Sequence, residues 1–368
     1  MIIKRFRAQN FRNIESCDIK FERGVNLLHG KNAQGKTNAV EGIYIFSRGR
    51  SFRAKEDSEL IRFGCDGFRI SIEYEDNNGC ESLEYAMFGK ERLRKKNGYK
   101  ITKLTEMIGG FKAVLFYPDN LGLVKGGPEE RRNFINIAAA SCYPTYIKQY
   151  ADYKKALENR NCILKFIQKG MYVDKCELDS WTSIMAEYAS HIYLFREDYI
   201  KRLLVYARKI LLDISDGKEE LDLSHECEIG EGLCDRAAVK EAYEREFISF
   251  YDRECAAGVS LAGPHRDDIK IKINGIDARS YSSQGQQRSV VLALKLAEGE
   301  IIKEICGEYP VYLFDDVLSE LDEKRKKYVL DGVGDKQIII TSCAKDDLDG
   351  FCANEIDVFG GEYVSSHR

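Results

Sequence analysis

Eight residues near the amino terminus have the types and spacing that hold a nucleoside triphosphate. They are Gly30, Lys31, Asn32, Ala33, Gln34, Gly35, Lys36 and Thr37, which read G-x-x-x-x-G-K-[ST]. The apolar residues 25–28 before them predict a strand, and residues 36–47 carry apolar side chains at helical spacing. In such a strand–loop–helix, the loop N–H groups and the positive end of the helix dipole point at one anion. The pattern predicts a site for ATP or GTP, and the alternative is a glycine-rich turn with an incidental lysine.

Two features predict the chemistry around the phosphates. Lys36 is expected to reach the β- and γ-phosphates, and the Thr37 hydroxyl is expected to bind Mg²⁺. Downstream, residues 311–314 form an apolar run that ends in Asp315 and Asp316. Asp315 can hold Mg²⁺ through water, whereas Asp316 is placed to polarise the attacking water. The alternative for this pair is a helix N-cap.

A second anion site is predicted where another helix begins. Its residues are Ser283, Gln284, Gly285 and Gln286, which precede an apolar helical face. A serine hydroxyl and glycine N–H groups at a helix N-terminus can bind an anion. Because the chain already has one complete phosphate loop, this stretch is best used by a second copy. We therefore expect a two-fold homodimer in which each ATP lies between the two copies.

Two basic segments have two interpretations each. Arg53 ends an arginine-rich run over residues 48–53, and it either borders the phosphates or lies on the solvated surface. Residues 90–100 are rich in lysine and arginine. They either hold a nucleic-acid backbone through its phosphates or form a solvated hairpin tip.

The elements that must position these residues predict an α/β fold in two parts. Residues 1–125 and 258–368 are expected to form one ATPase domain with a mixed β-sheet. Between them, residues 126–257 are rich in helix formers with apolar stripes, which predicts an inserted all-helical lobe. Antiparallel strands are expected at 68–74 and 82–88, and Asn274-Gly275 predicts a two-residue hairpin turn. The residues from Ser319 to Asp322 are expected to cap the following helix.

Composition narrows the class of protein. The chain has 368 residues, of which 44% are hydrophobic and 32% charged, which is typical of a soluble globular protein. It holds no apolar run of the ~20 residues that a membrane span needs. Its 12 cysteines are scattered, which suggests reduced thiols in a cytoplasmic protein. With a net charge of −4, any nucleic-acid binding must use a local basic surface.

The order of these motifs resembles the ABC-type ATPase heads of SMC-like proteins. Five segments are more specific, and together they resemble the RecF family of bacterial recombination-repair ATPases over essentially the whole chain. The segments are Gly49-Arg50-Ser51-Phe52-Arg53, Gly127-Pro128-Glu129-Glu130-Arg131-Arg132, Asn159-Arg160-Asn161, Gly263-Pro264-His265-Arg266-Asp267-Asp268 and Ser283-Gln284-Gly285-Gln286-Gln287-Arg288.

The resemblance implies a function that spacing alone does not give. RecF-like proteins are ATP-dependent DNA-binding dimers that act at gapped DNA, with double- and single-stranded parts, and at stalled replication forks. With RecO and RecR they load recombinase, and they support the SOS response, so a cytoplasmic, nucleoid-associated protein is implied. By motif, Lys36 and Thr37 are the Walker A pair and Asp315 and Asp316 are Walker B. The signature comprises Ser283, Gln284, Gly285 and Gln286, and the D-loop runs from Ser319 to Asp322. Together with Arg53, these two motifs complete the expected nucleotide site.

Some positions depart from the general ABC pattern. Thr341-Ser342 stand where a switch histidine is expected, Asp316 replaces the usual glutamate, and no clear Q-loop glutamine precedes the insertion. These departures predict slow hydrolysis. An ABC transporter nucleotide-binding subunit, a nuclease-coupled break-repair ATPase and a plain nucleotide kinase are the alternative classes.

Overall fold

The computed structural model describes residues 1–343 and 351–365 of the chain. These residues form two compact units, one from residues 1–120 and from 291 onward, the other from residues 121–290. Helix α10 (Gln284–Cys306) begins in the second unit and continues into the first. No helix in the described ranges is long and apolar enough to cross a membrane.

A mainly parallel sheet organises the first unit. Its strand order is β15-β14-β3-β13-β12-β8, and only β15 runs antiparallel to its neighbour. The strands are β3 (Val25–His29), β8 (Ala113–Phe116), β12 (Val311–Asp315), β13 (Gln337–Ser342), β14 (Ala353–Phe359) and β15 (Glu362–Ser365). Every residue of β3, β8, β12 and β13 is buried, as expected for strands covered on both faces. The strands predicted from apolar runs at 25–28 and 311–314 are therefore confirmed.

An antiparallel sheet forms the rest of the first unit, in the order β2-β1-β4-β5-β6-β7. Its strands are β1 (Ile2–Phe11), β2 (Ile14–Lys20), β4 (Gly67–Asp76), β5 (Gly79–Phe88), β6 (Glu91–Lys96) and β7 (Tyr99–Lys100). Helix α1 (Lys36–Arg48) contacts β1 and β4 of this sheet and β8 and β12 of the other. One apolar core joins the three, with Val40 and Ile43 of α1 fully buried in it. The hairpin predicted from alternating residues is confirmed as β4–β5.

Short elements complete the first unit. They are η1 (Asp57–Leu60), α2 (Leu104–Met107), η2 (Pro118–Leu121), η3 (Leu318–Glu320) and α11 (Glu323–Asp331). The Asp322 side chain accepts a hydrogen bond from the Arg325 N–H at 2.9 Å and caps α11, so the predicted cap is confirmed.

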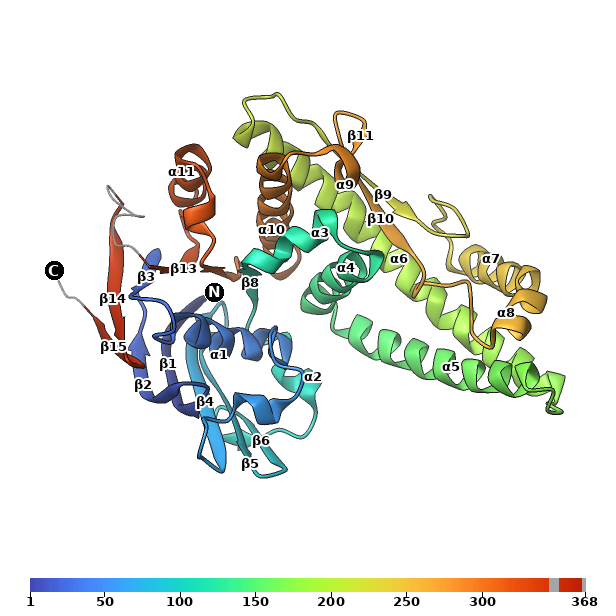
Figure 1. The fold of residues 1–368 in the computed structure, drawn as a ribbon, viewed down its shortest axis with the longest axis horizontal. Coiled ribbons are helices and arrows are strands. Elements are labelled where there is room, and N and C mark those ends of the chain that lie inside the picture. The colour runs from blue at the N-terminus through green and yellow to red at the C-terminus, as the bar shows by residue number, and fades with distance from the viewer. Residues whose placement is uncertain (344–350, 366–368) are drawn as a thin grey trace. The chain divides into compact units, whose positions relative to one another are not determined.

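The second unit is mostly helical. Its helices are α3 (Gly122–Lys125), α4 (Pro128–Cys142), α5 (Pro144–Gln168), α6 (Lys175–Ile214), α7 (Arg236–Ser249), α8 (Tyr251–Ala257) and α9 (Ala278–Tyr281). The long helices α5 and α6 pack along each other (Figure 1). Three ion pairs with buried arginines stabilise the unit. They are Arg131 with Asp268 at 2.7 Å, Arg160 with Glu254 at 2.6 Å and Arg196 with Asp267 at 2.8 Å. The basic partner in each pair lies on α4, α5 or α6, so these helices are tied to the segment around residues 254–268.

The second unit differs in one respect from the expected all-helical lobe. It contains a three-stranded sheet of β9 (Leu221–Glu226), β10 (Asp268–Ile273) and β11 (Ile276–Asp277). Strand β9 was missed because alternating apolar residues are few there and the flanking stretch is acidic. Strand β10 pairs with β9, with Ile271 opposite Leu223. Residues 258–290 therefore group with the second unit, whereas they were expected to belong to the ATPase domain. The hairpin predicted at Asn274-Gly275 is present, with φ of 52° and 78°.

Candidate nucleotide-binding site

The carboxyl ends of three neighbouring parallel strands bring the predicted nucleotide residues together. Strand β13 lies between β3 and β12, with Thr341 opposite Leu28 on one side and Asp315 on the other. The loop of residues 30–35 leaves β3 at this edge and enters α1. In open α/β sheets, ligands bind outside the carboxyl ends of the strands.

The loop conformation requires its two glycines. Gly30 has φ of 155°, and a Cβ there would lie 2.2 Å from the carbonyl oxygen of Val358. Gly35 precedes α1 with φ of 115°, a conformation that L side chains rarely adopt. The glycines predicted to let the backbone wrap closely are therefore needed at both ends of the loop.

Lys36 lies inside this loop. It is 6% exposed, and its ammonium group donates hydrogen bonds to the carbonyl oxygens of Gly30 and Lys31, the latter at 3.0 Å. The Sγ atom of Cys343 is 3.7 Å away. The ammonium group of Lys36 is thus held among backbone groups of the loop, where its positive charge can attract phosphate.

Oxygen donors suited to Mg²⁺ meet beside the loop. The hydroxyls of Thr37 and Thr341 both donate to Asp315 Oδ1, at 2.9 and 2.8 Å. Asp315 is 4% exposed, and its burial raises its pKa although these two hydrogen bonds act in the opposite direction. A hydroxyl and a carboxylate are ligands that Mg²⁺ accepts, so Thr37 and Asp315 fit the predicted metal.

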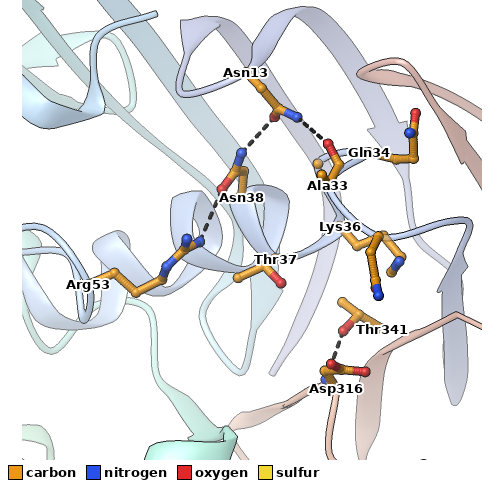
Figure 2. Close-up of a pocket in the computed structure, with 11 residues that line it drawn as sticks. Asn13, Ala33, Gln34, Lys36, Thr37, Asn38, Arg53, Asp316 and Thr341 are labelled. Atoms are coloured by element: carbon orange, nitrogen blue, oxygen red, sulfur yellow. Dashed lines mark hydrogen bonds between the residues drawn. The ribbon is translucent and has the colours of Figure 1, made fainter.

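Asp316 is oriented differently from Asp315. Its backbone has φ of 54°, and its N–H donates to the Thr341 hydroxyl at 2.9 Å. Its side chain borders the cavity at the mouth of the loop (Figure 2). The two adjacent carboxylates thus occupy separate positions, one beside the Thr37 hydroxyl and one at the open space.

A cavity of about 410 Å³ borders Lys36, Thr37, Asp316 and Thr341. It is lined by Asn13, Asn32, Ala33, Gln34, Gly35, Lys36, Thr37, Asn38, Arg53, Asp316 and Thr341. Arg53 therefore lies at the cavity, where its Nη1 is 3.2 Å from Asn38 Oδ1 and 3.8 Å from Glu41 Oε2. This position favours the first interpretation of Arg53, and its contact with phosphate stays a prediction.

Several residues of the site were not predicted. Asn13 Nδ2 donates to the carbonyl of Ala33 at 2.9 Å, and Asn38 Nδ2 donates to Asn13 Oδ1 at 2.6 Å (Figure 2). Glu41 on α1 is fully buried and binds Arg12 at 2.7 Å. The position of the Glu41 carboxylate on the apolar face of α1 could have indicated from the sequence that it has a partner, since a buried charge needs one. The asparagines gave no such signal, because each is common at turns and helix starts.

The predicted signature lies in the second unit, at the start of α10. Ser283 Oγ accepts a hydrogen bond from the Gln286 N–H at 3.2 Å, and Gln286 Oε1 accepts one from the Ser283 N–H at 2.9 Å. This reciprocal pair is a capping box, which fixes where the helix begins. Gln284 and Gly285 form its first turn. Neither the signature nor Ser319 and Asp322 of the predicted D-loop line the cavity, so their role in a second copy's site stays a prediction.

Three of the six lysines and arginines in residues 90–100 are paired with acidic side chains. Arg92 binds Asp57 at 2.7 Å and Lys96 binds Glu81 at 2.6 Å. Lys95 lies 3.5 Å from Glu84. These pairs reduce the positive charge that the hairpin offers to a nucleic acid, and contact of this run with DNA stays a prediction.

Comparison with known proteins identifies the family. The model of the RecF/RecN/SMC N terminal domain family matches residues 2–359. The DNA replication and repair protein RecF of Acetivibrio thermocellus is 38% identical over 94% of each chain. The chain belongs to the RecF family. The RecF of Bacillus subtilis is 36% identical over 95% of each chain.

Solved structures agree with this assignment. A structure described as the recombination mediator protein RecF-ATP in the RecFOR pathway superposes with a TM-score of 0.92. It is 34% identical and covers 100% of this chain and 98% of that one. An Smc head domain from Pyrococcus furiosus gives a TM-score of 0.58 at 17% identity, which shows the fold alone. The predicted ABC-type ATPase-head fold is confirmed.

Proposed function

We propose that this RecF-family chain is an ATP-dependent DNA-binding protein of recombinational repair and replication-fork maintenance. The observation that carries the proposal is the convergence of Lys36, Thr37 and Asp316 at one cavity, with Asp315 bonded to the Thr37 hydroxyl. They meet in a chain that aligns nearly end to end with curated RecF proteins. ATP is the proposed substrate, in line with the solved relative described as RecF-ATP.

The side chains at the cavity have distinct tasks in this proposal. The loop N–H groups and Lys36 bind the β- and γ-phosphates. Thr37 and Asp315 would hold Mg²⁺, which neutralises phosphate charge when bound. Asp316 orients and polarises the attacking water from the other side of the cavity. Arg53 adds positive charge at the rim and contacts the phosphates.

ATP also joins two copies of the chain. Ser283 and Gln286 of one copy, held by their capping box, face the nucleotide of the other, with Ser319 and Asp322 beside it. Hydrolysis releases the dimer, and it is slow and stimulated by DNA. Turnover is slow for two reasons. Asp316 is shorter than the glutamate usual in ABC-type ATPases, and Thr341 stands where a histidine is expected.

The ATP-bound dimer holds DNA where double- and single-stranded segments meet. At such gaps it acts with RecO and RecR to load recombinase and to support the SOS response. The protein is cytoplasmic and nucleoid-associated. These partners follow from the RecF family, of which the solved relative is described as part of the RecFOR pathway.

Sedimentation with gapped DNA tests the proposal. Purified chain is mixed with gapped DNA in Mg²⁺, with a non-hydrolysable ATP analogue or with ADP. The chain should sediment as a dimer with DNA only when the analogue is present. Equal DNA binding with either nucleotide would contradict the ATP dependence, and no DNA binding at all would favour a transporter-type subunit.

A further inference from the structure

Two hairpins of the first unit hold the phosphate loop from outside. In the turn between β1 and β2, Asn13 donates its Nδ2–H to the carbonyl oxygen of Ala33 at 2.9 Å. In the β14–β15 hairpin, the Gly361 N–H donates to the carbonyl oxygen of Gln34 at 3.1 Å. The Tyr363 hydroxyl donates to the carbonyl oxygen of Gly35 at 2.9 Å, and the same oxygen accepts the Ala39 N–H of α1 at 3.0 Å. Three consecutive loop carbonyls therefore have partners outside the loop.

This anchoring fixes where the loop N–H groups point. In a planar trans peptide, the C=O of one residue and the N–H of the next point in opposite directions. Anchored carbonyls at residues 33–35 therefore turn the N–H groups of Gln34, Gly35 and Lys36 away from the hairpins. These three residues line the cavity. Successive N–H groups directed at one space form an anion-binding nest.

The β14–β15 hairpin has further contacts with the loop. The Gly360 N–H donates to Gln34 Oε1, and the Gly30 backbone is packed so closely on Val358 that a Cβ would not fit. Strand β14 pairs in parallel with β3, with Ile356 opposite Leu28. The hairpin thus belongs to the same sheet as the strand that leads into the loop, so the two cannot shift independently.

We propose that Asn13 and the β14–β15 hairpin, through Gly361 and Tyr363, are positioning elements that set the phosphate-binding orientation of the loop. The proposal rests on the proposed function, in that the ligand is a nucleotide polyphosphate. The oriented N–H groups face the β-phosphate, which ADP and ATP share. Losing an anchor therefore weakens the binding of both nucleotides by the same factor. Losing the Tyr363 hydroxyl, which lies outside the cavity lining, leaves the hydrolysis rate at saturating ATP unchanged.

The test uses Tyr363→Phe and Asn13→Ala in the full chain, with calorimetric titration of ADP and of a non-hydrolysable ATP analogue. Each variant should raise both Kd values about 2- to 10-fold, the range expected for one hydrogen bond. In Tyr363→Phe, whose side chain lies outside the cavity lining, the kcat at saturating ATP should stay within about twofold of the parent value. Tyr85→Phe is the matched control, because that hydroxyl donates to Asp57 at 2.8 Å in the same unit and lies outside the cavity lining. It should leave both Kd values unchanged.

The outcomes separate the inference from the proposed function. If the parent chain binds neither nucleotide, both are overturned. If the parent binds but Tyr363→Phe and Asn13→Ala bind equally well, the inference is overturned and ATP binding stands. The same holds if Tyr85→Phe shifts the Kd as much, since general loosening would then explain the effect. Thermal unfolding of all three variants, followed by Tm, shows whether each is folded, and Asn13→Ala tests the inference if Tyr363→Phe is not.

Discussion

We expect nucleotide affinity to depend most on Lys36. Its ammonium group is buried within the loop, where it bonds to backbone oxygens of Gly30 and Lys31. Charge-assisted hydrogen bonds to phosphate are stronger than neutral ones, and no alanine can replace them.

We expect Lys36→Ala to weaken ATP binding by at least about 10- to 100-fold, the range for one or two charge-assisted hydrogen bonds. Equilibrium binding of a fluorescent ATP analogue measures it. Lys20→Ala is a suitable control, because Lys20 is an exposed lysine on β2 of the same unit. Unchanged affinity and turnover in Lys36→Ala would disprove the P-loop assignment.

The adjacent carboxylates should separate metal binding from water activation. Asp315→Asn removes a predicted Mg²⁺ ligand, so it should lower Mg²⁺-dependent ATP affinity and turnover together. Asp316→Asn should keep ATP affinity and slow hydrolysis 10²- to 10⁴-fold, the typical cost of losing a general base. Single-turnover hydrolysis beside equilibrium binding distinguishes the two. Equal binding losses in both variants would mean that Asp316 also holds the metal.

At the scale of elements, two buried parallel strands were predictable because each is an apolar run ending beside polar site residues. The runs at 25–28 and 311–314 became β3 and β12, and Lys36, Thr37 and Asp315 followed from them. Local sequence carries this information because a parallel strand is covered on both faces.

The rest of the site depends on contacts between distant segments. Asn13 reaches a loop 20 residues away, and Tyr363 reaches one 328 residues away. Neither an asparagine nor a tyrosine in the sequence indicates which distant residue it will bond to. Thr341 was noticed only as a missing histidine, yet its hydroxyl bridges Asp315 and the Asp316 N–H. Strand β9 was missed for a local reason, since charged neighbours hid its short alternation.

The start of α10 carries the prediction about a second copy. Ser283→Arg should replace a small side chain, where the other copy's γ-phosphate is expected, by one too long to fit between the copies. ATP-dependent dimers should therefore be lost while the monomer still binds ATP. The change also removes a helix cap, which costs about 1 kcal/mol of stability. Asp235→Ala controls for this, because Asp235 caps α7 of the same unit by accepting from the Ala238 N–H at 2.9 Å. Light scattering with and without ATP measures dimer mass, and dimers at the parent level in Ser283→Arg would refute the shared site.

At the scale of the whole molecule, the second unit should make stability depend on pH. His265 Nδ1 lies 2.6 Å from the Tyr153 hydroxyl, and burial lowers the pKa of His265 to about 4. In the unfolded chain the pKa of a histidine is about 6.5. Between pH ~4 and pH ~6.5 the unfolded chain therefore binds more protons at this residue than the folded chain does. His265 contributes stability above pH ~6.5 that is lost as the pH falls toward 4.

His265→Gln should remove this part of the acid dependence, at most about 1.4 kcal/mol per pH unit. Urea unfolding of parent and variant between pH 7 and pH 4.5 measures the difference. The comparison cancels His225, whose burial lowers its pKa but whose bonds to Asp267 and Glu197 raise it overall. Parallel stability curves for the two proteins would show that His265 is protonated equally in both states.

In the proposed function, ATP hydrolysis times the release of DNA by an ATP-bound dimer. The rate at which Asp316→Asn leaves gapped double-stranded DNA in the presence of ATP and Mg²⁺ tests it most directly, with the parent chain measured alongside. We predict that the variant dissociates more slowly, by a factor that follows its loss of hydrolysis, and that with ADP the two proteins leave equally fast. If Asp316→Asn binds ATP and fails to hydrolyse it but releases DNA as fast as the parent, hydrolysis does not control release.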